Sequence, residues 1–175
     1  KCGLAEKLNI AQRNVHAYVY GEHGDTSFVP WSVCRVAGSD LDDHIAIMKA
    51  LGKKVENVDR EEIIEYVRKS GGMIIEAKKC TNYAIGVTTA RLCEIIHNNN
   101  PSVTIVSTML KGEYGIEDVC LSIPTVVGGN GVEGRLAPAL TDDEVEKLKK
   151  RLAAAQQKSS GGSSGKKRIL SARLS

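Results

Sequence analysis

The sequence predicts an α+β fold in which a twisted, mostly antiparallel sheet packs with long helices. Three observations favour this class. The predicted strands form two groups, one before and one after two long helices, and do not alternate strictly with helices. Short turns separate the strands within each group, and two capping boxes each open a long helical pattern. With 175 residues, 42% of them apolar and 26% charged, the chain suits one globular domain rather than two large ones.

The first predicted elements surround a polar turn. Residues 3–8 have the pattern of a helix end, and residues 15–20 and 27–36 are rich in β-branched and aromatic side chains. We expect the latter two segments to pair as antiparallel strands. The turn between them, Gly21-Glu-His-Gly-Asp-Thr26, would then project its side chains from a rigid support.

Two long helices are expected next. Asp59 and Glu62 form a capping box that opens an amphipathic helix ending near residue 79. Gly71-Gly72 lies inside this helix, where each glycine costs about 1 kcal/mol relative to alanine. A second helix is expected at about 82–97, because an Asn-Asn-Asn-Pro sequence follows it.

Three strands follow, at residues 103–110, 118–127 and 132–136, and turns at 112–115 and 128–131 separate them. This spacing predicts a meander. The second turn opens Gly129-Asn-Gly-Val-Glu-Gly134, which matches the G-x-G-x-x-G dinucleotide fingerprint. A fingerprint must open a helix, whereas Arg-Leu-Ala-Pro follows here, so we interpret the motif as a hairpin turn.

The C-terminal part divides into three pieces. A capping box at residues 141–144 opens a last helix that reaches about residue 157, and we assign residues 1–157 to one domain. Residues 158–165 are a Gly/Ser run that we expect to be a flexible linker. Residues 166–175 have helix-forming residues with apolar spacing and are expected to belong to the same domain. A linker between two such pieces is typical of an engineered chain.

Composition argues against several classes of protein. The five cysteines are widely spaced without a C-x-x-C pair, which disfavours a disulfide framework or a zinc site. No apolar run approaches the roughly 18 residues of a membrane span, so we expect no membrane partner and a cytoplasmic location. Residues 158–175 hold five basic residues and no acid, which leaves residues 1–157 with a net charge of −2. With only 4% aromatic residues, a nucleic-acid partner is not expected.

His23 is the best candidate for chemistry. It lies in a glycine-flanked turn near Glu22 and Asp25, where carboxylates would favour its charged form, although a solvated surface histidine is the simpler interpretation. His16 lies seven positions earlier, which is not the i, i+4 spacing of a metal pair, so no metal site is expected. Thr81 either caps the following helix or binds a ligand oxygen.

Six sequence blocks occur in an order and spacing that a known family shares. They are Tyr20-Gly-Glu-His-Gly-Asp-Thr26, Val29-Pro-Trp-Ser32, Thr81-Asn-Tyr-Ala-Ile-Gly86, Val106-Ser-Thr-Met-Leu110, Tyr114-Gly-Ile-Glu-Asp118 and Ser122-Ile-Pro-Thr125. From about residue 4 to residue 152, the chain resembles the C-terminal, substrate-binding half of bacterial L-lactate dehydrogenase. Thr81 resembles the lactate enzymes more than the malate enzymes, in which a smaller residue usually stands there.

The resemblance implies a role for several residues. His23 would donate a proton to the substrate carbonyl, Thr81 would line the substrate pocket, and Ile85 would pack near the nicotinamide ring. His16 would match the histidine that helps to bind fructose 1,6-bisphosphate across a subunit interface in allosteric members. The resemblance also implies NAD as the cofactor of the complete enzyme and a homo-oligomer, either a dimer or a larger assembly.

The C-terminal segment resembles another part of the same family. Ile169-Leu-Ser-Ala-Arg-Leu174 is similar to the helix that precedes the segment starting at Lys1, so the chain resembles a circular permutant. Arg173 matches the arginine that grips the substrate carboxylate. Leu170, however, stands where the family has the aspartate that orients the catalytic histidine.

The Rossmann half of the family has no counterpart in this sequence. We therefore expect a chain that is inactive by itself, binds no cofactor alone and binds a pyruvate-like or lactate-like ligand weakly at best. Two alternatives stay open. The chain is an enzyme half that a Rossmann-domain partner activates, or it is a carboxylate or sugar-phosphate module that uses His16, Thr81 and Arg173.

Overall fold

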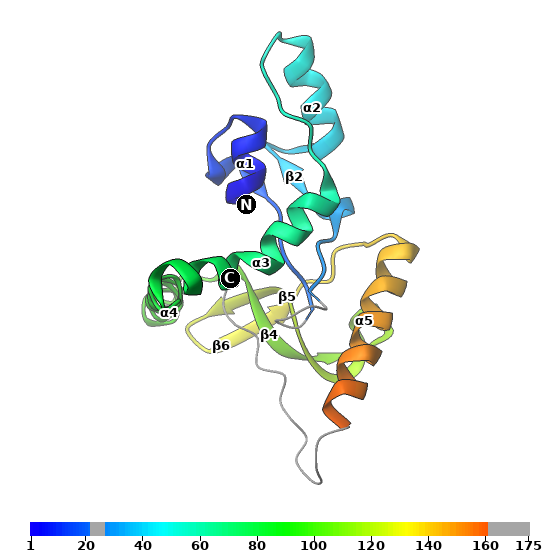
Figure 1. Cartoon of the computed structure of the whole chain (residues 1–175). Helices are drawn as coiled ribbons and strands as arrows, with labels where there is room; N and C mark the ends of the chain where they lie inside the picture. Colours follow the sequence, from blue (N-terminus) through cyan, green and yellow to red (C-terminus); the bar gives the residue numbers. More distant parts are fainter. Residues whose placement is uncertain (22–26, 161–175) are drawn as a thin grey trace.

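The computed structural model describes residues 1–21 and 27–160, and it confirms the predicted α+β class. Within these residues, five α-helices accompany two three-stranded antiparallel sheets (Figure 1). The helices are α1 (Cys2–Leu8), α2 (Leu41–Ala50), α3 (Arg60–Lys78), α4 (Tyr83–His97) and α5 (Asp142–Ser160). The strands are β1 (Val15–His16), β2 (Arg35–Val36) and β3 (Ser39–Asp40) in one sheet, and β4 (Ser102–Lys111), β5 (Glu117–Gly128) and β6 (Gly131–Arg135) in the other.

The larger sheet is the predicted meander, with β5 between β4 and β6. Its register pairs Ser107 with Ser122, and Gly128 with Gly131 across the β5–β6 hairpin. The G-x-G-x-x-G sequence is therefore a hairpin turn, as expected. The Gly129 N–H donates to the side-chain oxygen of Asn99, 2.8 Å away, which fixes this hairpin to the end of α4.

The strands predicted around the polar turn pair antiparallel, but in two short pieces. Val15 pairs with Val36 in the smaller sheet, and Tyr20 pairs with Phe28 next to the turn. Between these pieces the chain forms a short 3-10 helix, Trp31–Val33. The prediction of one continuous strand over 27–36 was wrong, because Pro30 has no N–H to give to a ladder and the chain turns there.

Both predicted helix starts are capped, but only the second cap is a reciprocal capping box, because the Glu62 carboxylate accepts from Lys7 instead. The Asp59 carboxylate accepts hydrogen bonds from the N–H groups of Glu61 and Glu62, at 2.9 and 3.3 Å, and so caps α3. At the start of α5, Glu144 and Thr141 each accept from the other's backbone N–H, at 3.2 and 3.3 Å.

One helix and one helix boundary differ from the predictions. Helix α2 was not predicted, although Asp42 and Asp43 occupy its first turn, because Leu41 is its only buried residue and the apolar period is weak. Helix α5 continues to Ser160, so the first three residues of the 158–165 run are helical. Residues 161–175, with the predicted segment 166–175, lie outside the described residues.

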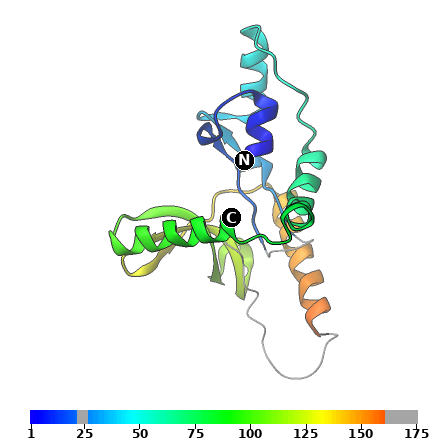
Figure 2. The ribbon, with the colours of Figure 1, turned by 60° about the vertical axis from the view of Figure 1, so that its left-hand side comes forward.

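Two buried clusters form the core. The first joins the larger sheet to α5, and the second joins α1 to the smaller sheet. The first contains Tyr20, Phe28, Ile105, Leu110, Ile116, Leu121, Ile123 and Leu148, and the second contains Leu4, Ala5, Leu8, Val15, Cys34, Val36 and Leu41. Helix α3 runs between these regions, and α4 lies beside the larger sheet (Figure 2).

Candidate functional site

The turn that contains His23 has a closed base. Tyr20 and Phe28 exchange backbone hydrogen bonds of 2.7 and 3.1 Å. Gly21 and Ser122 exchange another pair, of 3.1 and 2.9 Å, which attaches the turn to the central strand β5. His23 itself, with residues 22–26, lies outside the described residues. The residue just before the undescribed segment, Gly21, is therefore fixed to the larger sheet.

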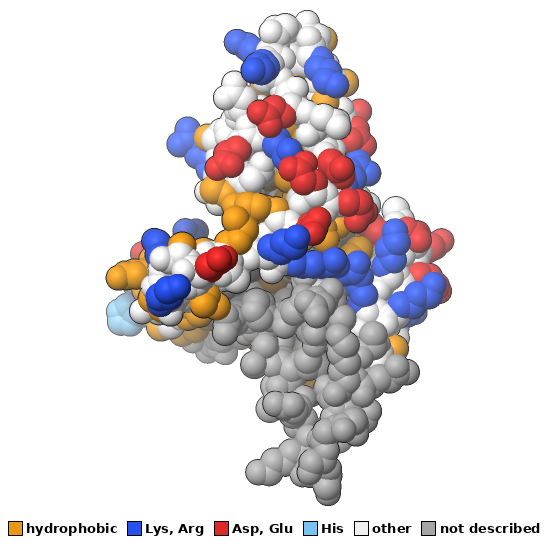
Figure 3. Space-filling model, in the orientation of Figure 1, with side chains coloured by type: hydrophobic (Ala, Val, Ile, Leu, Met, Phe, Trp, Pro, Cys, Tyr) orange, Lys and Arg blue, Asp and Glu red, His pale blue; other side chains and the backbone are white. Residues whose placement is uncertain are grey.

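Two arginines meet at the other end of the turn. Arg68 of α3 and Arg151 of α5 both donate hydrogen bonds to the carbonyl oxygen of Ser27. The Arg151 guanidinium also lies 5.9 Å from the centre of the Phe28 ring. Burial, and then the nearby charge of Arg68, lower the pKa of Arg151. Lys and Arg side chains gather where α3 approaches α5, with Asp and Glu side chains beside them (Figure 3).

Glu144 of α5 binds Ser32, which follows the polar turn in the chain. Its side chain is buried and accepts hydrogen bonds from the N–H of Ser32, at 3.1 Å, and from the Ser32 hydroxyl. Burial by itself would raise the pKa of Glu144, but the hydrogen bonds from Ser32 and Thr141 outweigh it and lower that pKa. The ionised carboxylate thus holds the chain just after the turn against the start of α5.

Thr81 and Ile85 lie at the junction of α3 and α4. The Thr81 side chain is half-buried, and Ile85 is 39% exposed. Asn82 is the N-cap of α4 and makes no side-chain cap, and the Thr81 hydroxyl makes no hydrogen bond within the described residues. The interpretation of Thr81 as a helix cap is therefore not supported.

His16 lines a groove of about 700 Å³ between β1, α4 and β4. Lys1, Arg13 and Arg91 line the same groove, and among residues 1–21 and 27–160 no Asp or Glu does. Burial, and then the charge of Arg91, lower the pKa of Lys1, whose ammonium lies 4.7 Å from the centre of the Tyr18 ring. The groove is therefore cationic, with four basic side chains converging on it.

The sequence analysis missed Arg13 and Arg91 as partners of His16. Arg13 lies only three residues before His16, whereas Arg91 lies far along the chain on α4 and only the fold brings it to the groove. Thr81 and Ile85 do not line this groove, so the structure does not bring them together with His16.

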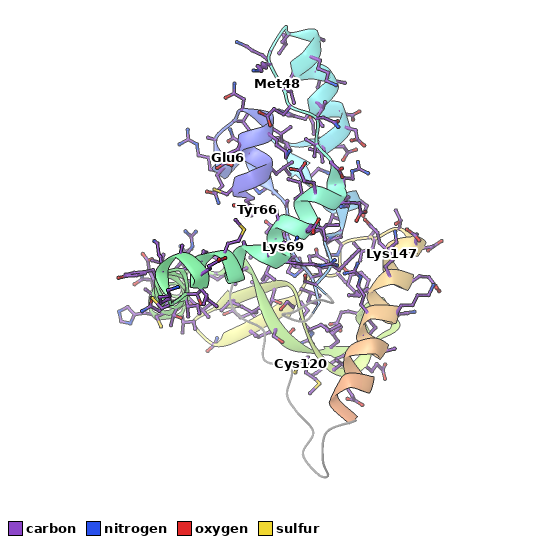
Figure 4. All side chains as sticks on the ribbon, in the orientation of Figure 1. Glu6, Met48, Tyr66, Lys69, Cys120 and Lys147 are labelled. Atoms are coloured by element: carbon purple, nitrogen blue, oxygen red, sulfur yellow. The ribbon has the colours of Figure 1, made fainter. Side chains whose placement is uncertain are left out.

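A second, smaller cavity of about 280 Å³ lies at the start of α1. Its walls include Val19 and Val29, which flank the polar turn, and Trp31, whose indole nitrogen is buried without a hydrogen-bond partner among the described residues. The Tyr66 ring reaches from α3 toward α1 and packs over Gly3 (Figure 4). The cavity thus adjoins both ends of the turn and the first residues of the chain.

No cluster of three or more His, Cys, Asp or Glu side chains suited to a metal ion occurs in residues 1–21 and 27–160. None of the described helices combines the length and apolar character needed to cross a bilayer. Arg173 and Leu170 lie outside the described residues, so their predicted roles stay predictions.

Two antiparallel sheets and long helices, with Gly21 joined to the central strand β5, define the class of this protein as an α+β domain. Comparison with known families gives the particular assignment. Residues 1–160 match the family described as lactate/malate dehydrogenase, alpha/beta C-terminal domain. The chain belongs to this family.

Individual relatives agree with this assignment. The chain is 40% identical over 147 residues to an L-lactate dehydrogenase of Acetivibrio thermocellus, which covers 84% of this chain and 45% of that protein. Among solved structures, a lactate dehydrogenase from a deep-sea metagenome library superposes with a TM-score of 0.80 at 32% identity, covering 89% of this chain and 49% of the other. A malate dehydrogenase of Cryptosporidium parvum gives a TM-score of 0.76 at 28% identity, with the same coverage of 89% and 49%. The chain therefore spans about half the length of the relatives it matches.

Proposed function

We propose that this chain is the substrate half of an NAD-dependent L-lactate dehydrogenase and that His23 is its proton donor. The observation that carries the proposal is the family match over residues 1–160, which includes the turn of His23 and its closed base on β5. Proton donation suits an imidazolium, which can release its proton near neutral pH.

The chemistry assigns a task to each predicted residue. In pyruvate reduction, a hydride adds to the carbonyl carbon while the His23 imidazolium transfers its proton to the carbonyl oxygen, which gives lactate and a neutral imidazole. Arg173 would hold the substrate carboxylate through paired hydrogen bonds, and Thr81 would line the pocket. NADH, when bound to the complete enzyme, supplies the hydride.

The described residues fit only one part of the cofactor. Ile85 and Tyr83, which are 39% and 76% exposed, offer an apolar surface for the face of a nicotinamide ring. The one G-x-G-x-x-G sequence forms a hairpin and opens no helix, so it offers no phosphate site of the dinucleotide type. We therefore infer that the chain alone does not retain NAD and that a nucleotide-binding half must present it.

Helix α4 supports docking of such a half. It is an apolar helix without one buried residue in the described structure, and Tyr83 and Val87, one turn apart, are 76% and 72% exposed. Met73, Ile74 and Ile75 at the end of α3 are also about half exposed. Apolar surface of this extent is typical of an interface rather than of a solvated face.

We also infer that the segment 169–174 supplies the carboxylate-gripping helix in relocated form. The cavity at the start of α1 supports this inference. The first residues of α1 border it together with Val19 and Val29, so the cavity lies between the start of α1 and the two sides of the His23 turn. Leu170 in place of the orienting aspartate leaves His23 without its partner. By analogy with orienting carboxylates in other enzymes, this change reduces the rate by about four orders of magnitude.

Complementation tests this function. The purified chain is mixed with the nucleotide-binding half of a related lactate dehydrogenase, NADH and pyruvate, and the nicotinamide absorbance is followed. We expect slow oxidation that needs both halves, is lost in His23→Gln and rises in Leu170→Asp. If the mixture with Leu170→Asp is as inactive as either half alone, this chain is not a complementing enzyme half.

The cationic groove favours a second candidate function, a sugar-phosphate or carboxylate module that uses His16. Calorimetry with fructose 1,6-bisphosphate and with oxamate tests it, and a loss of heat in His16→Gln is expected.

We expect the chain to be a dimer or a larger homo-oligomer, as the family resemblance suggests. Light scattering that gives the mass of a monomer contradicts this expectation.

A further inference from the structure

Helix α3 changes character near its middle. In its first half Ile63 is buried, and Glu62 forms an ion pair of 3.0 Å with Lys7 of α1. From residue 71 to residue 80, by contrast, every residue is exposed. The rest of the described chain therefore holds the first half of α3 and leaves the second half uncovered.

The contacts of the second half stay local. The Lys79 ammonium donates to the carbonyl oxygen of Glu76, and the Lys78 ammonium lies 6.0 Å from the centre of the Tyr83 ring. Among the described residues, none outside α3, α4 and their connection forms a hydrogen bond or an ion pair with residues 71–82. No polar contact thus fixes the second half to either sheet.

The sequence Ser70-Gly71-Gly72 stands at the junction of the two halves. An added Cβ at either glycine would meet no atom within 4 Å, so no neighbouring side chain supports the helix there. The Ser70 hydroxyl donates to the carbonyl oxygen of Val67, 2.8 Å away, where it competes with the hydrogen bonds of the helix. Glycine and serine are common causes of helix kinks, and α3 changes direction near its middle (Figures 1 and 2).

The second half of α3 has little stability as a helix. Each glycine lowers the folding equilibrium of a helix about fivefold relative to alanine. The helix from Gly72 to Lys78 is only about two turns long, and helices shorter than about 12 residues are marginal in water without tertiary packing. None of its side chains is buried to compensate. Local opening of this half is therefore much more frequent than unfolding of the domain.

This uncovered half leads to the predicted pocket residues. Thr81 follows it directly, and Ile85 lies at the start of α4. The far end of α4 is fixed, because the Asn99 side chain accepts a hydrogen bond of 2.8 Å from the N–H of Gly129 in the β5–β6 hairpin. Thr81 thus lies between a weak point in α3 and a helix whose end is fixed to the larger sheet.

We propose that Ser70-Gly71-Gly72 is a hinge and that residues 73–82, which we call the arm, open and close about it while the rest of the domain stays folded. Closing brings Thr81 to one position relative to the first half of α3, and opening removes it from there. A nucleotide-binding half that packs on Met73 and Ile74 would favour the closed arm. The hinge itself does not depend on the proposed function, whereas its effect through Thr81 rests on it.

Amide hydrogen exchange of the full chain tests the hinge. After correction for intrinsic rates, the N–H groups of residues 74–78 should exchange at least about tenfold faster than those of residues 63–67. The double variant Gly71→Ala with Gly72→Ala should slow exchange at 74–78 about 25-fold, which is about fivefold for each glycine. Exchange at 63–67 should change by less than about threefold, because that half is already held by its contacts.

Gly86→Ala is the matched control. Gly86 is also a helical glycine at which an added Cβ would meet no atom within 4 Å, but it lies in α4. This variant should leave exchange at 74–78 within about twofold of the wild type. Circular dichroism checks that each variant is folded, and if the double variant is not, the comparison of the two halves of α3 in the wild-type chain decides.

The effect at Thr81 needs a separate measurement. When the nucleotide-binding half of a related lactate dehydrogenase is added and the mixture oxidises NADH, exchange at 74–78 should slow at least about tenfold. An active mixture with unchanged exchange in the arm overturns the role of the arm at Thr81. An inactive mixture contradicts the proposed function instead, and exchange of the chain alone still decides the hinge.

Two results overturn the hinge. The first is exchange at 74–78 that is as slow as exchange at 63–67 in the wild-type chain. The second is a double variant in which exchange slows equally along the whole of α3, since this would mean that the glycines weaken the helix as one unit and mark no boundary within it.

Discussion

The larger sheet and helix α4 use similar apolar residues with opposite results. In β5, Leu121 and Ile123 are 2% and 0% exposed, because α5 and the residues before the polar turn pack on them. In α4, Ile96 is 39% exposed and Val87 72%, and no residue of the helix is buried. The difference shows that an apolar pattern predicts a surface that has to be covered. It does not predict whether the covering residues belong to this chain or to another one.

The largest expected effect comes from truncating one isoleucine in each region. Ile123→Ala should lower the free energy of unfolding by about 2–5 kcal/mol, because it leaves a cavity in a fully buried cluster. Ile96→Ala is the matched control and should change it by less than about 1 kcal/mol, since its side chain already meets solvent. Urea unfolding of both variants measures the contrast, and equal losses would contradict the assignment of α4 as uncovered.

Removing the carboxylate that fixes α5 should have the next largest effect. Glu144→Gln should cost about 1.5–3 kcal/mol at pH 7, since it weakens hydrogen bonds from Ser32 and Thr141 to a charged acceptor. The pKa of Glu144 is lowered in the folded chain, so its contribution is present above the unfolded pKa and is lost as the pH falls through the folded value.

Unfolding at a series of pH values checks this sign. The difference between the wild-type chain and Glu144→Gln should be largest near pH 7 and should shrink on acidification below the ordinary range of a glutamate. A difference that grows toward low pH would show that the carboxylate is not held in its charged form.

A smaller effect is expected from the glycines of α3. Gly71 and Gly72 lie inside the helix, and an added Cβ would meet no atom within 4 Å at either position. Gly71→Ala and Gly72→Ala should each raise the free energy of unfolding by about 1 kcal/mol. Gly129→Ala is the opposite control, because its Cβ would lie 2.6 Å from the Asn99 side-chain oxygen, and thermal melting should show a lower midpoint for it.

The smallest change in stability should come from polar substitutions on α4. The double variant Tyr83→Ser with Val87→Ser replaces residues that are 76% and 72% exposed, so the free energy of unfolding should stay within about 0.5 kcal/mol of the wild type. Binding of an apolar dye should nevertheless fall, because the exposed patch is smaller. A large loss of stability would mean that this face is covered within the chain.

Much of this fold was predictable because its signals are local. The Asp59 and Thr141 caps and the hairpin at Gly128 to Gly131 depend on neighbours within four residues, and the structure confirms them. Helix α2 was missed because only Leu41 is buried, so its apolar period is faint. The interruption at Pro30 had a local signal, because proline has no N–H to donate to a strand ladder.

The candidate site was less predictable than the fold. His16 stood out only through the family resemblance, and nothing near it in sequence pointed to Arg91, which the packing of α4 beside the larger sheet brings to the same groove. The pairing of Gly21 with Ser122 likewise depends on tertiary structure. The roles of His23, Thr81, Ile85 and Arg173 stay predictions from the family resemblance.

The bond between Ser32 and Glu144 also has a consequence for the order of events during synthesis. The two residues are 112 positions apart, and Arg151 reaches Ser27 across 124 positions. Contacts of such separation form late, since a long loop must close before they are made. As the chain leaves the ribosome, the segment after the polar turn has to wait for α5. A ribosome-bound chain that stops before residue 142 should therefore be cleaved readily between residues 27 and 32, and the full chain should be protected there.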